Sequence, residues 1–74
     1  MAVRLELYRG FLEVAKQGNI SAAAQNLFIS QSAVSQSVKQ LEEQLQVRLF
    51  SRSTRGVSLT SEGKLLLEYV SHAL

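Results

Sequence analysis

The most regular pattern of apolar and polar positions lies in residues 31–45, QSAVSQSVKQLEEQL. Val34, Val38, Leu41 and Leu45 recur at the spacing of one face of an α-helix. The opposite face carries serine, glutamine and one lysine, whereas a face exposed only for solubility usually mixes glutamate and lysine. Such short hydrogen-bonding groups favour contact with base edges in a DNA major groove. A bundle helix with an exposed serine- and glutamine-rich side fits this stretch equally well.

Two shorter helices are predicted before this segment. The first covers residues 4–17, and Gly18 is suited to end it. Its apolar stripe consists of Leu5, Tyr8, Phe11, Leu12 and Ala15. The second covers residues 22–28, with Ser21 as its predicted N-cap.

The short gap between the second and third helices predicts a helix-turn-helix. Ala23 and Ala24 allow another helix to approach closely, as two steeply crossing helices require. Ser30 is placed to cap the helix that follows. The second helix of such a motif enters the major groove. An ordinary αα-hairpin also fits this composition.

The pattern then changes to a partial alternation of apolar and polar residues over residues 48–59, interrupted by a turn-rich segment. This predicts a β-hairpin whose loop uses a positive φ at Gly56. We expect Leu49, Val57 and Leu59 to pack on the helices, because a two-stranded ribbon is unstable alone.

Positive charge collects in and beside this hairpin, although the net charge of the chain is only +2. Residues 48–64 contain a single anion, Glu62, and four cations: Arg48, Arg52, Arg55 and Lys64. Exposed cations on a hairpin beside a helix-turn-helix are typical of a wing that contacts phosphates. In so short a chain, a chance excess of basic residues is the alternative.

Residues 60–74 predict a last helix that is apolar on more than one side. Thr60 is its predicted N-cap, and Gly63 indicates a close approach to a neighbouring element. One stripe consists of Leu66, Tyr69, Val70 and Ala73. Leu67 and Leu74 lie on another side, which one small core does not easily bury. We therefore expect a partner helix to cover that side, and interpret the chain as a fragment or as a domain that finds such a partner.

Length and composition restrict the class of protein. The chain of 74 residues, 46% of them hydrophobic, predicts one small folded domain. It has no cysteine and no stretch typical of a signal peptide or membrane span, so a cytoplasmic protein is expected. No enzymatic activity, cofactor or metal is expected, because the lone His72 has neither cysteine nor aspartate to work with.

Three segments together resemble a known family. They are SAAA at 21–24, SQSAVS at 30–35 and the run from Phe50 to Gly63 that contains FSR, VSLT and a final glycine. At this separation they closely resemble the N-terminal DNA-binding domain of LysR-type bacterial transcriptional regulators. The resemblance covers nearly the whole chain. It implies a mainly α winged helix-turn-helix at 1–59, with a three-helix core and a two-stranded wing, followed at 60–74 by the start of a linker helix.

The resemblance also implies which residues contact DNA. Carried over by position, these are Ser21, Gln31, Ser32, Ser35, Gln36, Lys39, Arg52, Thr54 and Arg55. The helix at 31–45 would read the major groove, the wing at 48–59 would approach the backbone or minor groove, and Ser21 would contact a phosphate. Gln36 stands where many members carry arginine, which favours an amide reading adenine. Gln46 stands where the family commonly has glycine.

The family assembles through its linker helix, so the resemblance implies a homodimer, often a tetramer in full-length regulators. The predicted dimer contacts are Leu67, Val70 and Leu74. A small-molecule effector would act only through a C-terminal domain that these residues do not include, and no membrane is involved. The predicted function is specific binding of a partly palindromic, A/T-rich operator. A winged-helix protein-interaction module and a non-specific nucleic-acid binder are the alternatives.

Overall fold

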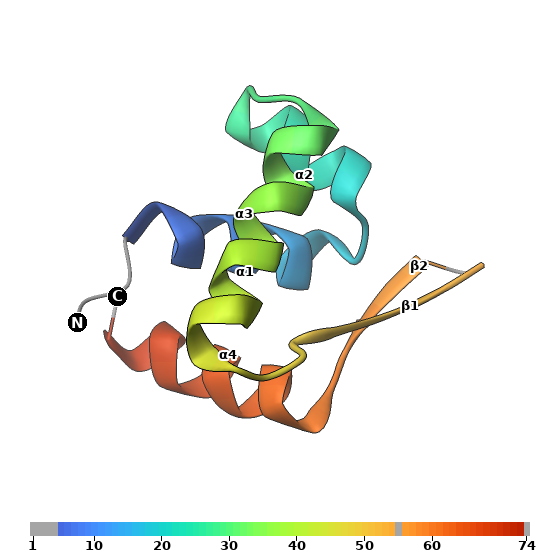
Figure 1. Cartoon of the computed structure of the whole chain (residues 1–74). Coiled ribbons are helices and arrows are strands. Elements are labelled where there is room, and N and C mark those ends of the chain that lie inside the picture. The colour runs from blue at the N-terminus through green and yellow to red at the C-terminus, as the bar shows by residue number, and fades with distance from the viewer. Residues whose placement is uncertain (1–4, 55, 74) are drawn as a thin grey trace.

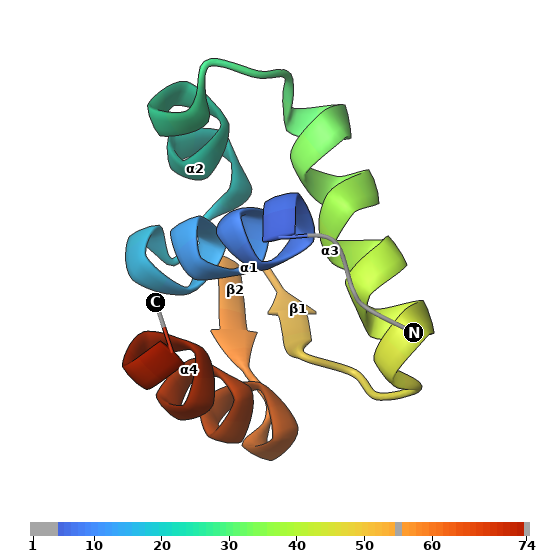
Figure 2. The same cartoon turned by 90° about the vertical axis from the view of Figure 1, so that its left-hand side faces the viewer.

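The computed structural model describes residues 5–54 and 56–73. Within them the elements follow in the order α1 (Leu5–Gln17), α2 (Ile20–Leu27), α3 (Gln31–Leu45), β1 (Phe50–Ser53), β2 (Gly56–Leu59) and α4 (Ser61–Ala73). Helix α1 lies in the middle, with α2 on one side and α4 on the other (Figures 1 and 2). The strands form an antiparallel hairpin that extends away from the helices. This arrangement confirms the predicted winged helix-turn-helix.

The core lies where α1, α3 and the base of the hairpin meet. Its largest fully buried side chains are Phe11, Val14, Val34, Leu41 and Leu49. The rings of Phe11 and Phe50 are 5.4 Å apart at their centroids, which joins α1 to the first residue of β1. Aromatic pairs at this distance contribute beyond their buried area. The hairpin therefore rests on the helices at its base, as its short strands require.

The buried face of α1 differs from the predicted stripe. Leu7, Gly10 and Val14 face inward together with Phe11, whereas Leu5 is 54% exposed. The reason is the close contact with α3, because a Cβ atom at Gly10 would lie 3.0 Å from the Ser37 hydroxyl oxygen. That contact turns the glycine side of α1 inward. Tyr8, Leu12 and Ala15 are only partly buried at the edge of the core.

The start of α2 also differs from the prediction. Its N-cap is Asn19, whose Oδ1 accepts a hydrogen bond from the Ala22 N–H at 2.7 Å. The predicted cap, Ser21, instead lies in the first turn, because the extended backbone needed at the cap position falls at Asn19. The cap of α3 was predicted correctly: Ser30 Oγ accepts from the Ala33 N–H at 3.1 Å.

Helix α4 begins as predicted, with Thr60 Oγ1 accepting from the Gly63 N–H at 3.0 Å. A Cβ atom at Gly63 would collide with the Leu49 carbonyl oxygen, so the predicted close approach is confirmed. Val70 is buried in the interior of the chain, while Leu65 is 70% and Tyr69 is 79% exposed. No helix in the described part of the chain is long and apolar enough to cross a membrane.

Candidate nucleic-acid interface

One row of polar side chains runs along the outer face of α3. Gln31, Ser35 and Lys39 follow each other at four-residue steps and therefore share one side of the helix. Gln31 and Lys39 are exposed and Ser35 is half-buried. The opposite side of α3 is held in the core by Val34 and Val38, which are 0% and 3% exposed. Because Val34 and Val38 hold one side of α3 in the core, the row of Gln31, Ser35 and Lys39 always faces away from the core.

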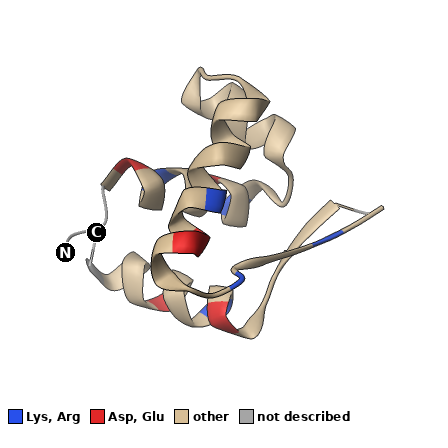
Figure 3. Cartoon of the chain, in the orientation of Figure 1, with Lys and Arg blue, Asp and Glu red and all other residues tan. Residues whose placement is uncertain are grey.

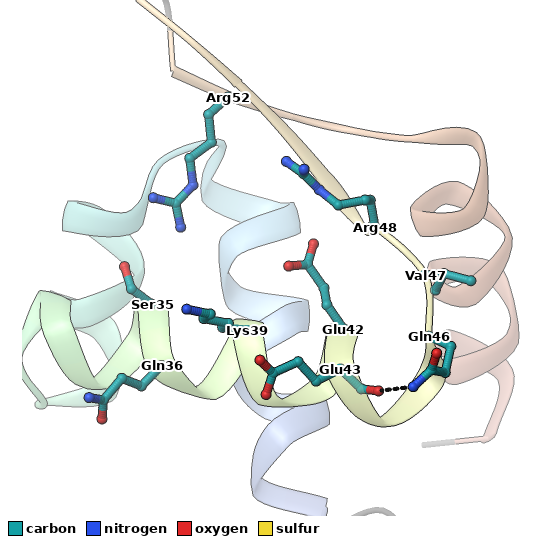
Figure 4. Close-up of a pocket in the computed structure, with 9 residues that line it drawn as sticks. All are labelled: Ser35, Gln36, Lys39, Glu42, Glu43, Gln46, Val47, Arg48 and Arg52. Atoms are coloured by element: carbon teal, nitrogen blue, oxygen red, sulfur yellow. Dashed lines mark hydrogen bonds between the residues drawn. The ribbon is translucent and has the colours of Figure 1, made fainter.

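This row borders an open groove between α3 and β1, which we call the α3–β1 groove. Its volume is about 700 Å³, and it is lined by Ser35, Gln36, Lys39, Glu42, Glu43, Gln46, Val47, Arg48 and Arg52. The side chains of Ser35, Lys39 and Arg52 extend toward one another from the two sides, while Gln36 points to the other side of α3 (Figure 4). Gln36 also borders a second hollow, whose lining from α1 consists of Glu6 and Leu7.

The cations of the groove come from both of its walls. Lys39 lies on α3, while Arg48 precedes β1 and Arg52 lies within it. Figure 3 shows lysine and arginine positions in blue on both α3 and the hairpin. All three side chains are exposed. In the hairpin Arg52 pairs with Val57, and Val57 packs on the core, which places Arg52 on a supported part of the strand.

Of the two predicted DNA contacts in the loop of the wing, Thr54 and Arg55, the structure describes only the first. Thr54 is exposed in the turn that follows β1. Arg55 lies outside the described residues. Gly56 has a φ of 121°, so the predicted positive φ in the loop is confirmed.

Glu42 joins α3 to the base of the wing. Its Oε2 accepts hydrogen bonds from the Leu49 N–H at 2.8 Å and the Phe50 N–H at 3.2 Å. The apolar and polar pattern of α3 does not reveal this contact, because the two N–H groups belong to a different element. The available signal was the unfavourable place of an acidic residue near the C-terminus of a helix. Such a placement indicates that another interaction holds the carboxylate.

Gln46 closes α3 in the conformation that glycine usually supplies. Its φ is 60°, and its backbone N–H donates to the Glu42 carbonyl oxygen. Its side-chain amide also donates to the Glu43 carbonyl oxygen at 3.3 Å. The helix therefore ends at Gln46, and its side chain adds a bond to one of the last free carbonyls.

The tertiary structure brings Ser21 to the start of α3. The Gln31 side-chain amide donates to Ser21 Oγ at 3.1 Å, although the two residues are ten positions apart. Both side chains are exposed. Ser21 therefore lies at the upper end of the row formed by Gln31, Ser35 and Lys39. Ser32 is also exposed and, with Gln36, forms the adjacent row.

The chain matches a described family over most of its length. Residues 5–64 match the family "Bacterial regulatory helix-turn-helix protein, lysR family". The chain belongs to the LysR family. It is 46% identical over 66 residues to the HTH-type transcriptional regulator PerR of Escherichia coli K12, and this match covers 89% of the chain. It is 42% identical over 67 residues to GltR of Bacillus subtilis 168, covering 90% of the chain.

These LysR relatives are much longer than the chain, which spans 22% of PerR and 23% of GltR. Solved structures share the fold of this LysR domain. The chain is similar to the CbnR_DBD–DNA complex with a TM-score of 0.91 and 35% identity, covering 96% of the chain and 82% of that protein. It is similar to BenM_DBD in complex with catB site 1 DNA with a TM-score of 0.92 and 31% identity, covering 96% and 80%.

Proposed function

We propose that this chain is the DNA-binding domain of a bacterial transcriptional regulator and that it binds a specific operator in duplex DNA. The observation that carries the proposal is the α3–β1 groove, in which hydrogen-bonding side chains of α3 face cations of the wing. The similar chains CbnR_DBD and BenM_DBD were both solved in complex with DNA. Such a regulator acts in the cytoplasm, where the bacterial chromosome lies.

In this proposal α3 enters the major groove and reads bases. The helix has 15 residues, which makes it roughly 22 Å long, and the major groove of B-DNA is about 12 Å wide. Gln31 and Ser35 face base edges along one row, and Ser32 and Gln36 along the next. Amide and hydroxyl groups both donate and accept, so they distinguish the donor and acceptor pattern of each base pair.

The wing supplies affinity that does not depend on sequence. Arg52 and Arg48 approach phosphates from one wall of the groove, and Lys39 approaches from the other. The exposed hydroxyl of Thr54 suits a backbone contact, and family resemblance adds Arg55. Each cation that neutralises a phosphate releases a counterion, which makes binding depend steeply on salt.

A second copy of the chain is proposed to bind through α4. The described apolar side chains of α4 that are open to a partner are chiefly Leu65 and Tyr69. Leu67, which was also expected in this interface, is half-buried and packs against the core of its own chain. Val70, which the sequence placed in this interface, is buried in the core of its own chain, and Leu74 lies outside the described residues. A symmetric dimer would contact two half-sites of an operator. An effector would act through the additional length that the relatives possess.

The test is fluorescence anisotropy of this chain on a duplex selected from a randomised library and on a scrambled duplex, across a salt series. We expect a steep salt dependence together with clearly tighter binding of the selected duplex. Equal binding of both duplexes would instead indicate a non-specific nucleic-acid binder. Absence of binding at low salt would favour a protein-interaction module and overturn the proposal.

A further inference from the structure

The contact between Ser21 and Gln31 is the starting point. Both side chains are free of the helix caps beside them, because Asn19 caps α2 and Ser30 caps α3. The Ser21 hydroxyl oxygen therefore accepts the Gln31 amide N–H at 3.1 Å without giving up a capping bond. The two exposed groups hold each other at the point where the helix-turn-helix presents the start of α3.

The contact determines which hydrogen-bonding groups Gln31 has left. A glutamine amide has two N–H donors and one carbonyl oxygen with two lone pairs. With one N–H donated to Ser21, one N–H and the carbonyl oxygen Oε1 remain. These are the two groups that an amide uses to pair with N7 and N6 of adenine in the major groove. The long side chain, which would otherwise sample several rotamers, is held near one position before DNA arrives.

We propose that Ser21 is a positioning residue for base recognition: its hydroxyl holds the Gln31 amide so that the remaining N–H and Oε1 read an adenine. This inference rests on the proposed function. As the acceptor in this bond, the Ser21 hydroxyl keeps its own proton to donate to a phosphate, so one side chain links a backbone contact to a base contact. A phosphate contact alone affects all duplexes equally, whereas positioning affects one base pair.

The experiment uses the 74-residue chain. A duplex selected from a randomised library is changed one base pair at a time, and binding is measured for the parent, Ser21→Ala, Ser21→Thr, Gln31→Ala and the double variant Ser21→Ala/Gln31→Ala. Ser71→Ala, which changes an exposed serine of α4, is the matched control. Thermal unfolding followed by circular dichroism is recorded for each variant, and we expect Ser21→Ala to leave it unchanged because Ser21 is exposed and does not cap α2.

We expect Gln31→Ala to remove the preference for adenine at one base pair. Ser21→Ala should lower that same preference by about threefold to tenfold, the effect of one lost hydrogen bond, and leave the other base pairs unchanged. Ser21→Thr, which keeps the hydroxyl, should restore the preference. In the double variant the serine change should add no further loss of discrimination, because the side chain that Ser21 positions is already gone.

Other results overturn the inference in distinguishable ways. Equal weakening on every duplex by Ser21→Ala would reduce Ser21 to a phosphate contact. Independent, additive losses from the two single changes would show that Ser21 does not act through Gln31. A Gln31-dependent preference for a base other than adenine would overturn the assigned base. If the parent chain selected no sequence at all, the proposed function itself would be wrong. If the parent selected a sequence and Ser21→Ala left every base preference unchanged, only the inference about Ser21 would be wrong.

Discussion

Helix α3 and the wing line the same groove but are built in different ways. Helix α3 has its own cap at Ser30, a regular apolar stripe and 15 residues of continuous hydrogen bonding. Each strand of the wing has four residues, and its base is held by Glu42 from α3 and by packing on Phe11. The helix presents hydroxyl and amide side chains from a rigid backbone, and the wing presents long cations from a supported ribbon. Hydroxyl and amide groups, which both donate and accept, suit base discrimination, and long flexible cations suit phosphates.

The largest predicted effect concerns the bond between the two regions. Glu42→Ala leaves the N–H groups of Leu49 and Phe50 without their carboxylate partner. We expect the free energy of unfolding to fall by about 2–4 kcal/mol, since hydrogen bonds to charged groups contribute about 1.5–3 kcal/mol each. Urea denaturation measures the change. Glu43→Ala, at the exposed neighbouring residue, is the control and should stay within about 0.5 kcal/mol of the parent. Equal effects of the two changes would show that Glu42 does not hold the wing.

A slightly smaller effect is expected where α4 meets the base of the wing. In Gly63→Ala the new Cβ atom would collide with the Leu49 carbonyl oxygen. Backbone must shift to admit it, which we expect to cost about 1–3 kcal/mol in thermal or urea unfolding. Gly18→Ala is not a suitable control, because Gly18 has a positive φ of 74°. The exposed Ser71→Ala serves instead and should leave stability unchanged. A neutral Gly63→Ala would mean that the packing of α4 on Leu49 is looser than described.

The next prediction separates base reading from phosphate binding on α3. Ser35→Ala removes the hydroxyl from the middle of the row that faces the groove. We expect discrimination between the selected and the scrambled duplex to fall by about 1–3 kcal/mol, if measured at constant salt. Anisotropy titrations on both duplexes give the ratio. An unchanged ratio would remove Ser35 from the set of base-reading residues.

The corresponding change in the wing should lower the affinity for all duplexes and leave the discrimination between them unchanged. Arg52→Ala is expected to weaken binding to all duplexes by about 1 kcal/mol and to lower the slope of log K against log salt by roughly 1. The ratio between selected and scrambled duplex should remain. Arg9→Ala, an exposed arginine of α1 outside the groove, is the matched control and should leave the slope unchanged. Loss of discrimination in Arg52→Ala would assign base reading to the wing as well.

The smallest predicted effect is stabilising and concerns the entry to α3. Phe28 has a φ of 59° and is 93% exposed, so its side chain gains little from packing while its backbone is in the left-handed region. Phe28→Asn should raise the free energy of unfolding by about 0.5–1 kcal/mol, because asparagine adopts this conformation at lower cost. Gln46→Asn, at the other end of α3, should gain less because it loses the bond to the Glu43 carbonyl. Urea denaturation of both variants tests the order.

Features that depend on neighbouring residues were predictable from sequence. The bounds of α3, its cap at Ser30 and the cap of α4 at Thr60 follow from a helical period preceded by a short hydroxyl side chain. The same rule predicted the wrong cap for α2, Ser21 in place of Asn19, because both residues are good caps and only the backbone conformation distinguishes them.

The sequence by itself determined the order of helices and hairpin, the apolar stripe of α3 and the kinds of side chain that face outward, since these depend on periodicity and caps within a few residues. Tertiary structure alone decided which side of α1 faces inward, where the Glu42 carboxylate bonds and that Ser21 meets Gln31. The physical reason is that each of these depends on contacts between separate elements. Helix packing sets their geometry, and no local pattern encodes a hydrogen bond between residues ten positions apart in two helices.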